Sequence, residues 1–214
     1  MIRIDLQLGS TKEWTEIFDR RAQTIFVRRD DPPDLGQSVR LDLTVGSGGP
    51  RVILRGTVCA QQSPTSGLPA GFRLALGPYE REKVSYLSGY VRGGLLNLRE
   101  MRRLPIRLPV TVRSVAGEGA GYTRDLNEAG VFIVDEDPLP EQTRVELEIA
   151  LPGHRDALML RGTVAHTVVV DDQDVPGMGI RFELDDKAQR SLEGVVDELE
   201  RRFVSGELPE DALL

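Results

Sequence analysis

Apolar and polar residues alternate along much of this 214-residue chain, a pattern typical of antiparallel strands with one buried face. The alternation is clear around Leu41 and Leu54 in the first half of the chain, and around Leu147 and Leu160 in the second half. Clusters of glycine, proline and aspartate interrupt these runs and indicate turns. The pattern therefore predicts a mainly β protein.

Two segments have helical spacing instead. Near the end of the chain, apolar residues follow Asp185 or Asp186, either of which can cap a helix. These apolar residues form one helix face and are Leu192, Val195, Val196, Leu199 and Phe203. The earlier segment starts near Pro78, ends at Gly93-Gly94, and has Val84, Leu87 and Val91 on its apolar stripe.

The sequence repeats itself at a constant offset of 106 residues. Leu54-Arg55-Gly56-Thr57-Val58 recurs as Leu160-Arg161-Gly162-Thr163-Val164, and several apolar triplets follow the same offset. After an apparent two-residue insertion, Gly71-Phe72-Arg73-Leu74 recurs as Gly179-Ile180-Arg181-Phe182. We therefore predict two tandem small antiparallel β-barrels, each followed by a C-terminal helix. The expected parts are a domain at 1–91, an arginine-rich linker at 92–103, a domain at 104–206 and a mobile tail at 207–214.

Composition narrows the class of protein. The net charge of -7 argues against a nucleic-acid polymer as partner, and no apolar run is long enough for a membrane span. The N-terminus lacks a signal-peptide core, and Cys59 is the only cysteine, so we expect a cytoplasmic protein. His154 and His166 are the only histidines, and no metal site is expected.

One cationic stretch stands out in this acidic chain. Six arginines lie between Arg92 and Arg113, and Glu100 is the single acid among them. Such a stretch suggests a local anion site. A carboxylate, an amide and a glycine, Asp125, Asn127 and Gly130, follow where the strand pattern resumes. By themselves they would indicate an Asx-type turn, and the arginines a solvated segment.

Both motifs together have a known counterpart. Arg99-x-x-x-Arg103 directly precedes a strand, and Asp125-x-Asn127-x-x-Gly130 follows it. In this order and context the second copy resembles the PilZ family, bacterial domains that bind cyclic di-GMP. The resemblance covers roughly residues 99–204 and extends more faintly to 1–91. The sequence departs from the family at Asn127, where the family has serine.

The resemblance implies roles for these residues. Arg99 and Arg103 would contact the phosphates and the guanine edges, and Arg102 would help to neutralise phosphate. Asp125 would accept hydrogen bonds from guanine N1 and N2, and Asn127 would add an amide hydrogen bond. Gly130 would allow close backbone approach or a positive φ. Cyclic di-GMP would be the ligand, with no further cofactor.

The first copy lacks these motifs. The offset would place its arginine motif before Met1, and Asp19, Arg21 and Thr24 stand at the positions of Asp125, Asn127 and Gly130. We predict that the first copy does not bind the nucleotide, and that it is a partner surface or packs against the second copy. A ligand that orders the arginine-rich connection would then change the arrangement of the two domains.

Three functions remain open at this point. The favoured one is a cyclic di-GMP receptor that passes the signal to a downstream protein partner. The second is a PilZ-like interaction or scaffold protein whose site has decayed, with Asn127 as the sign. The third, an enzyme, is not expected, because no nucleophile, base or metal cluster can be identified. The sequence leaves the output, ligand stoichiometry and oligomeric state undetermined.

Overall fold

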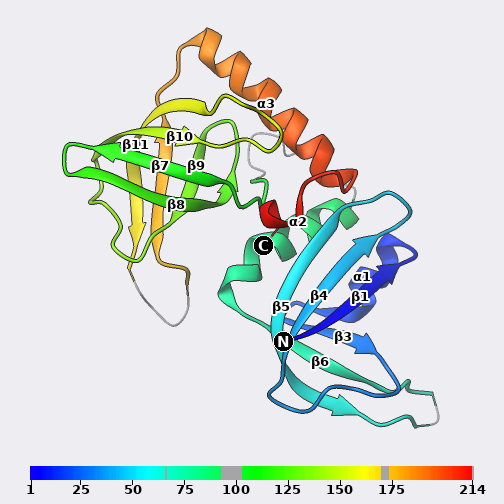
Figure 1. Ribbon diagram of the computed structural model, residues 1–214. Coiled ribbons are helices and arrows are strands. Elements are labelled where there is room, and N and C mark those ends of the chain that lie inside the picture. The colour runs from blue at the N-terminus through cyan, green and yellow to red at the C-terminus, as the bar shows by residue number, and fades with distance from the viewer. Residues whose placement is uncertain (66, 93–102, 170–173, 214) are drawn as a thin grey trace. The chain divides into compact units, whose positions relative to one another are not determined.

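The computed structural model describes the chain except for residues 66, 93–102, 170–173 and 214, and it divides into two units. Met1–Leu95 with Val204–Gly206 form the first unit, and Leu96–Phe203 with Glu207–Leu214 form the second. Each unit has its own sheet (Figure 1). Of the predicted linker, only Arg92 and Arg103 lie among the described residues.

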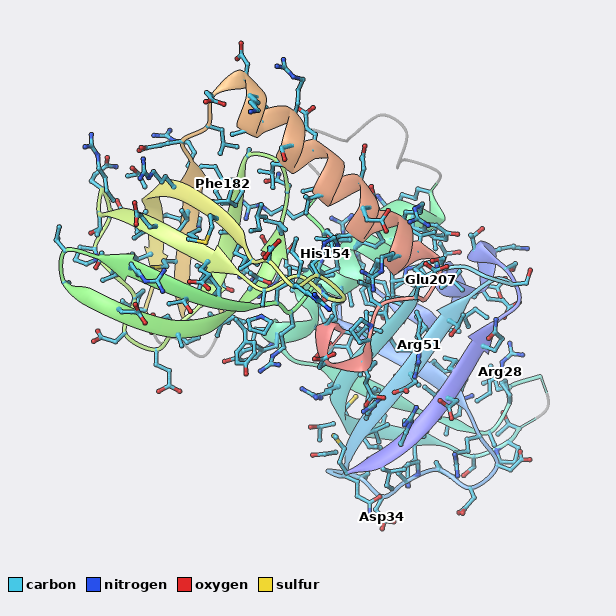
Figure 2. All side chains as sticks on the ribbon, turned by 45° about the horizontal axis from the view of Figure 1, so that its top comes forward. Arg28, Asp34, Arg51, His154, Phe182 and Glu207 are labelled. Carbon is cyan, nitrogen blue, oxygen red and sulfur yellow. The ribbon has the colours of Figure 1, made fainter. Side chains whose placement is uncertain are left out.

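The second unit contains a closed six-stranded barrel in the order β10-β11-β12-β9-β8-β7. Its strands are β7 (Pro109–Ser114), β8 (Gly117–Leu126), β9 (Gly130–Val134), β10 (Arg144–Ile149), β11 (Leu158–Val168) and β12 (Gly177–Phe182). All neighbouring strands run antiparallel. Phe182, labelled in Figure 2, ends β12 opposite Gly162 of β11. The mainly β class and this closed antiparallel barrel are confirmed.

Helix α3 (Asp186–Val204) follows the barrel as the apolar spacing predicts. The Asp185 side chain caps it by accepting a hydrogen bond from the Ala188 N–H at 2.8 Å. Four residues of the predicted face are buried, while Val195 is only partly buried; the buried ones are Leu192, Val196, Leu199 and Phe203. The cap and the apolar stripe therefore account for both the start and the orientation of the helix.

The segment after α3 corrects the prediction of a mobile tail at 207–214. A short 3₁₀ helix, η4 (Glu210–Ala212), forms here, and the Ala212 carbonyl accepts a hydrogen bond from the Arg107 N–H at 2.9 Å. Leu208, Ala212 and Leu213 are buried. The acidic residues between them are exposed, so the acidic composition obscured an apolar pattern that binds this segment to its unit.

The first unit differs from the predicted antiparallel barrel. Its six strands form a sheet in the order β1-β4-β5-β6-β3-β2, and β1 runs parallel to β4. The strands are β1 (Ile2–Leu8), β2 (Phe18–Asp19), β3 (Thr24–Arg28), β4 (Ser38–Val45), β5 (Arg51–Gln62) and β6 (Gly71–Leu76). The helices are α1 (Thr11–Ile17), η1 (Pro78–Glu80) and the predicted α2 (Arg81–Val91).

Helix α1 explains the difference, because the repeat aligns residues 11–20 with strand β8 of the second unit. The Glu13 side chain reaches back and accepts a hydrogen bond from the Gly9 N–H at 3.2 Å. Trp14 is buried and stacks on Phe18, with ring centroids 5.0 Å apart. The sequence Ser10-x-x-Glu13 is a helix-start signal that the strand interpretation overlooked. Because α1 stands where the second unit has strand β8, the first unit lacks the equivalent of the β7–β8 hairpin, in which β1 would pair with an antiparallel neighbour.

The offset of 106 persists through the other strands, including β6 and β12. Val27 pairs with Phe72 in the first unit, and Ile133 pairs with Met178 in the second. Gly71 therefore corresponds to Gly177, and the predicted two-residue insertion, which matched Gly71 to Gly179, was wrong. An added Cβ would lie 2.4 Å from the Val27 carbonyl at Gly71 and 2.1 Å from the Ile133 carbonyl at Gly177. The same close approach of two strands requires glycine in both units.

Candidate functional site

The predicted arginine and aspartate motifs come together in the second unit, as far as its residues are described. Leu104 and Leu126 exchange two backbone hydrogen bonds, of 2.7 and 3.0 Å, and form an isolated bridge. This bridge places Arg103 beside Asp125, although 22 residues separate them in the sequence. Arg99 and Arg102 lie outside the described residues.

Asp125 is the centre of the site. Its side chain has no exposed surface, and its Oδ1 accepts a hydrogen bond from Arg103 Nη1 at 2.6 Å. Its Oδ2 accepts from Arg124 Nε at 2.8 Å. The Arg103 side chain remains 36% exposed. Because both carboxylate oxygens bind guanidinium groups away from solvent, the geometry favours Asp125 as the residue that positions Arg103. The expected direct contact from Asp125 to guanine stays a prediction.

Arg124 is part of this arrangement, although the sequence analysis did not single it out. The pairing of β8 with β9 shifts between Thr123 and Asp125, so Arg124 sits at an irregularity in the strand. Its guanidinium carbon lies 3.7 Å from the centroid of the Phe132 ring. Its Nη1 also lies 3.7 Å from Asp174 Oδ1. Strict alternation cannot reveal a bulge, so the only available signal was the position of Arg124 beside the motif aspartate.

Asn127 forms the turn between β8 and β9. Its Oδ1 accepts hydrogen bonds from the Ala129 N–H at 3.1 Å and the Gly130 N–H at 2.9 Å. A serine hydroxyl can accept hydrogen bonds in the same kind of turn, so we expect a serine at this position to keep the local geometry. Among the described contacts, none uses the Asn127 amide nitrogen, which is a donor available to a ligand.

Gly130 is required by the barrel itself. A Cβ at this position would lie 2.3 Å from the Ile180 carbonyl oxygen on the neighbouring strand β12. The expected close backbone approach is therefore present, and the backbone that approaches belongs to the protein. The motif glycine allows the strand after the Asn127 turn to enter the barrel.

The equivalent positions of the first unit form a different turn. The Asp19 side chain accepts hydrogen bonds from the Ala22 N–H at 3.1 Å and the Arg21 N–H at 2.9 Å. These hydrogen bonds lower the pKa of Asp19 below its usual value of 3.8. Asp19 is exposed, whereas Asp125 is buried between two arginines. The first copy keeps a turn at this place and lacks the carboxylate–arginine arrangement of the second.

The first unit has its own buried carboxylate at another position, Asp42 on β4. Arg40 Nε lies 2.6 Å from Asp42 Oδ1, and Arg3 Nη2 and Arg51 Nη2 lie 2.6 and 3.1 Å from Oδ2. Burial by itself would raise the pKa of Asp42, but the hydrogen bonds from Arg40 and Arg51 outweigh it. The pKa of Asp42 therefore lies below the usual 3.8, and the carboxylate helps to hold three strands together.

Two other arginines of the second unit are paired with acids on a different part of the barrel. A cavity of about 490 Å³ borders β7, β10 and β11, with Arg113, Arg144 and Arg161 in its lining. Arg161 Nη2 lies 3.0 Å from Glu146, and Arg113 Nη1 lies 3.0 Å from Glu148. These ion pairs reduce the attraction of this surface for an anion, so cavity size alone does not identify the functional site.

Comparison with known proteins identifies the second unit. Residues 97–198 match the family model of the PilZ domain. The chain therefore contains a PilZ domain, as the sequence motifs predicted. No curated protein matches the chain. In the part of the chain that the structure describes, no helix is long and apolar enough to cross a membrane.

Three solved structures illustrate the similarity. The PilZ domain of CeSA from a cellulose-synthesizing bacterium is 24% identical, and the match covers 46% of this chain and 97% of that one, with a TM-score of 0.36. The PilZ domain of YcgR from Escherichia coli, with c-di-GMP, is 16% identical over 47% of this chain and 92% of that one (TM-score 0.37). MrkH of K. pneumonia in its apo state is 13% identical over 90% and 95% (TM-score 0.40).

Proposed function

We propose that this protein is a cyclic di-GMP receptor and that Arg103 is its principal ligand-binding residue. The observation that carries the proposal is the position of the Arg103 side chain inside the PilZ domain. This side chain is 36% exposed, and its Nη1 lies 2.6 Å from Oδ1 of the fully buried Asp125. A side chain fixed on one side and open on the other loses little conformational freedom when it binds. Arg99 and Arg102 of the same motif would add charge for the phosphates.

The chemistry of the site suits this ligand. A guanidinium can donate paired hydrogen bonds to a phosphate or to the O6 and N7 atoms of guanine, and its flat face can stack on a purine. The Asn127 amide nitrogen adds a donor at the turn beside Arg103. We assign Asp125 and Arg124 a positioning role, because both form the ion-pair network that supports Arg103.

Titration calorimetry of the intact chain with cyclic di-GMP tests the proposal. We expect saturable binding that weakens by about 5- to 150-fold in Arg103→Ala, which corresponds to the loss of about 1–3 kcal/mol for one bidentate contact. Arg144→Ala is the matched control, because Arg144 is an exposed arginine of the same unit on another strand, and it should bind normally. The molar ratio at saturation would separate one bound nucleotide from a stacked pair.

The opposite result supports the alternative function. If the intact protein does not bind at tens of micromolar, the receptor proposal fails and a scaffold with a decayed site is favoured. If Arg103→Ala and Arg144→Ala weaken binding equally, the nucleotide binds elsewhere or through general charge. Release of a hydrolysed product during the titration would instead indicate an enzyme.

We further propose that the ligand changes the arrangement of the two units and that a downstream protein reads this change. The support is the location of the arginine motif, which begins a few residues after the boundary between the units at Leu95.

The exposed Cys59, which is the only cysteine, allows labelling of the first unit. Val115→Cys provides a fully exposed position in the second. Energy transfer between dyes at these positions should change with cyclic di-GMP and remain constant in Arg103→Ala. No change in the intact protein at saturation would overturn this mechanism.

A further inference from the structure

The first unit has an open sheet edge, which the closed barrel of the second unit lacks. Strand β1 lies at one end of the sheet order and pairs only with β4 (Figure 1). Within the part of the chain that the structure describes, no strand pairs with its other side. An unpaired edge of seven residues is a template for another strand.

The backbone groups that face this edge can be assigned. The Leu8 carbonyl accepts a hydrogen bond from the Gly46 N–H at 2.8 Å, and Gly46 directly follows β4. Residues of a strand direct their hydrogen-bonding groups alternately to the two sides. The even-numbered residues of β1 therefore face β4, and Arg3, Asp5 and Gln7 direct their N–H and C=O groups to the open edge.

The side chains of the same strand carry opposite charges two residues apart. The side chains of Arg3 and Asp5 are 50% and 81% exposed. The nearest cationic partner described for Asp5 is Arg3, at 3.9 Å, which leaves room for a closer partner. Arg3 Nη2 also lies 2.6 Å from Oδ2 of the buried Asp42, so Asp5 of a second copy would share a guanidinium that Asp42 already holds in place. On the other face of β1, Ile2 is 37% exposed, whereas Ile4 is buried.

We propose that β1 pairs antiparallel with β1 of a second copy of this chain, about a twofold axis at Ile4. In this register Arg3 lies opposite Asp5 of the second copy, and Asp5 lies opposite Arg3. Ile2 lies opposite Leu6, which extends the apolar face across the junction. Arg3 and Asp5 are also residues that point to the edge, so each opposite pair exchanges two backbone hydrogen bonds.

Other registers are less favourable. An axis at Leu6 places Asp5 opposite Gln7, and an axis at Ile2 places Arg3 opposite Met1, so neither brings the two opposite charges together. Moving the twofold axis to Arg3 or to Asp5 places like charges opposite one another, which is unfavourable. Moving it to a position between two residues brings an apolar face against a polar one. Strand β1 also contains no proline or lysine, residues that commonly protect an edge from pairing. The self-complementary order of Arg3 and Asp5 therefore favours a second copy over an unrelated partner.

Sedimentation equilibrium of the full chain tests the association. A single pair of edge strands buries a small interface, so we expect a reversible dimer with a dissociation constant on the order of 10 to 100 μM. Asp5→Arg should shift the protein to monomer, because Arg3 then faces an arginine. Arg3→Asp should do the same through opposed acids, and because it also removes the Arg3–Asp42 ion pair, its effect on association counts only where the first unit stays folded. Fluorescence of the buried Trp14 verifies that each variant retains the first unit.

Mixing the two variants gives the sharpest result. The Asp5→Arg strand carries two arginines and the Arg3→Asp strand carries two aspartates, so they complement one another in this register. We expect a heterodimer at concentrations where each variant alone is monomeric. A wild-type monomer at several hundred micromolar overturns the proposal. The proposal is also overturned if these substitutions leave the dissociation constant of the dimer unchanged. A mixture that stays monomeric while both variants remain folded would overturn it as well.

A cross-link tests the position of the axis. In a Cys59→Ser background, Ile4→Cys places two thiols directly opposite one another at the twofold axis, at a separation that suits a disulfide. Gln7→Cys is the matched control on the same strand, because Gln7 faces Met1 of the second copy. We expect oxidised dimer from Ile4→Cys and much less from Gln7→Cys. Equal cross-linking of the two would contradict the proposed register.

Discussion

The turn at Asn127 provides the clearest quantitative prediction. Asn127→Ala removes the oxygen that accepts hydrogen bonds from the Ala129 and Gly130 N–H groups. Ala129 is exposed, so water can replace its partner, whereas Gly130 is buried. One buried N–H without an acceptor costs about 1–3 kcal/mol. For a unit of about 100 residues, this lowers the melting temperature by about 4–8 °C per kcal/mol.

Two optical probes and a conservative variant make this prediction testable in the intact chain. Far-UV circular dichroism follows both units, whereas the fluorescence of Trp14, the only tryptophan, follows the first. We expect Asn127→Ala to lower the melting of the second unit and to leave the Trp14 transition in place. Asn127→Ser should remain close to wild type, because its hydroxyl can accept in the same turn.

The result would be decisive for the interpretation of Asn127. If Asn127→Ala melts within about 2 °C of wild type, the turn contacts contribute little and the reasoning fails. If Asn127→Ser is as unstable as Asn127→Ala, the asparagine has a geometry that serine cannot supply, and the equivalence to the family serine is refuted. Cyclic di-GMP titration of the same variants would then show whether a substitution changes the affinity for the nucleotide independently of the melting temperature.

Three further predictions concern other contacts. Gly130→Ala should destabilise the second unit by about 1–3 kcal/mol in urea unfolding, because its Cβ would meet the Ile180 carbonyl at 2.3 Å, whereas Gly119→Ala has open space and should be nearly neutral. Thr123→Val should cost about 1–3 kcal/mol in the same assay, because the buried hydroxyl accepts from one backbone N–H and donates to one carbonyl; Thr123→Ser should restore most of the loss. The pKa of Asp42 is lower in the folded protein than the usual 3.8, so its contribution to stability is present above that pH and is lost as the pH falls through the folded pKa. Tryptophan fluorescence during acid titration should therefore show that Asp42→Asn reduces the dependence of first-unit stability on pH below about 4, and an unchanged pH profile would contradict the assignment.

Periodicity predicted the strands and helices well because it reports which residues face the core. It identified the face of α3 with Leu192, Val196 and Leu199, and the repeat located equivalent strands in both halves. It does not report strand direction, so the parallel pairing of β1 with β4 could not be read from Ile2, Ile4 and Leu6. Periodicity also could not decide whether Gly177 or Gly179 corresponds to Gly71. That choice depends on the distance from each glycine to the backbone of the neighbouring strand.

The candidate site was only partly predictable for a similar reason. The motif identified Arg103, Asp125, Asn127 and Gly130, and the structure brings the first two together through the Leu104–Leu126 bridge. The contribution of Arg124 depends on a strand irregularity and on the ring of Phe132, both of which are tertiary features. The roles of Asp125 and Gly130 also depend on burial and on the neighbouring strand, which spacing along the sequence does not reveal.

The exchange of a hairpin for helix α1 also changes how the first unit can fold. In the second unit, β7 and β8 are joined by a short turn and can pair soon after nucleation, since closing a short loop costs little entropy. In the first unit, β1 must find β4 across an intervening helix and two strands. Contacts of high sequence separation form late and slowly. We therefore expect β1 to dock last during refolding and to show the lowest hydrogen-exchange protection of the long strands, so that the two copies of the repeat differ in their order of assembly.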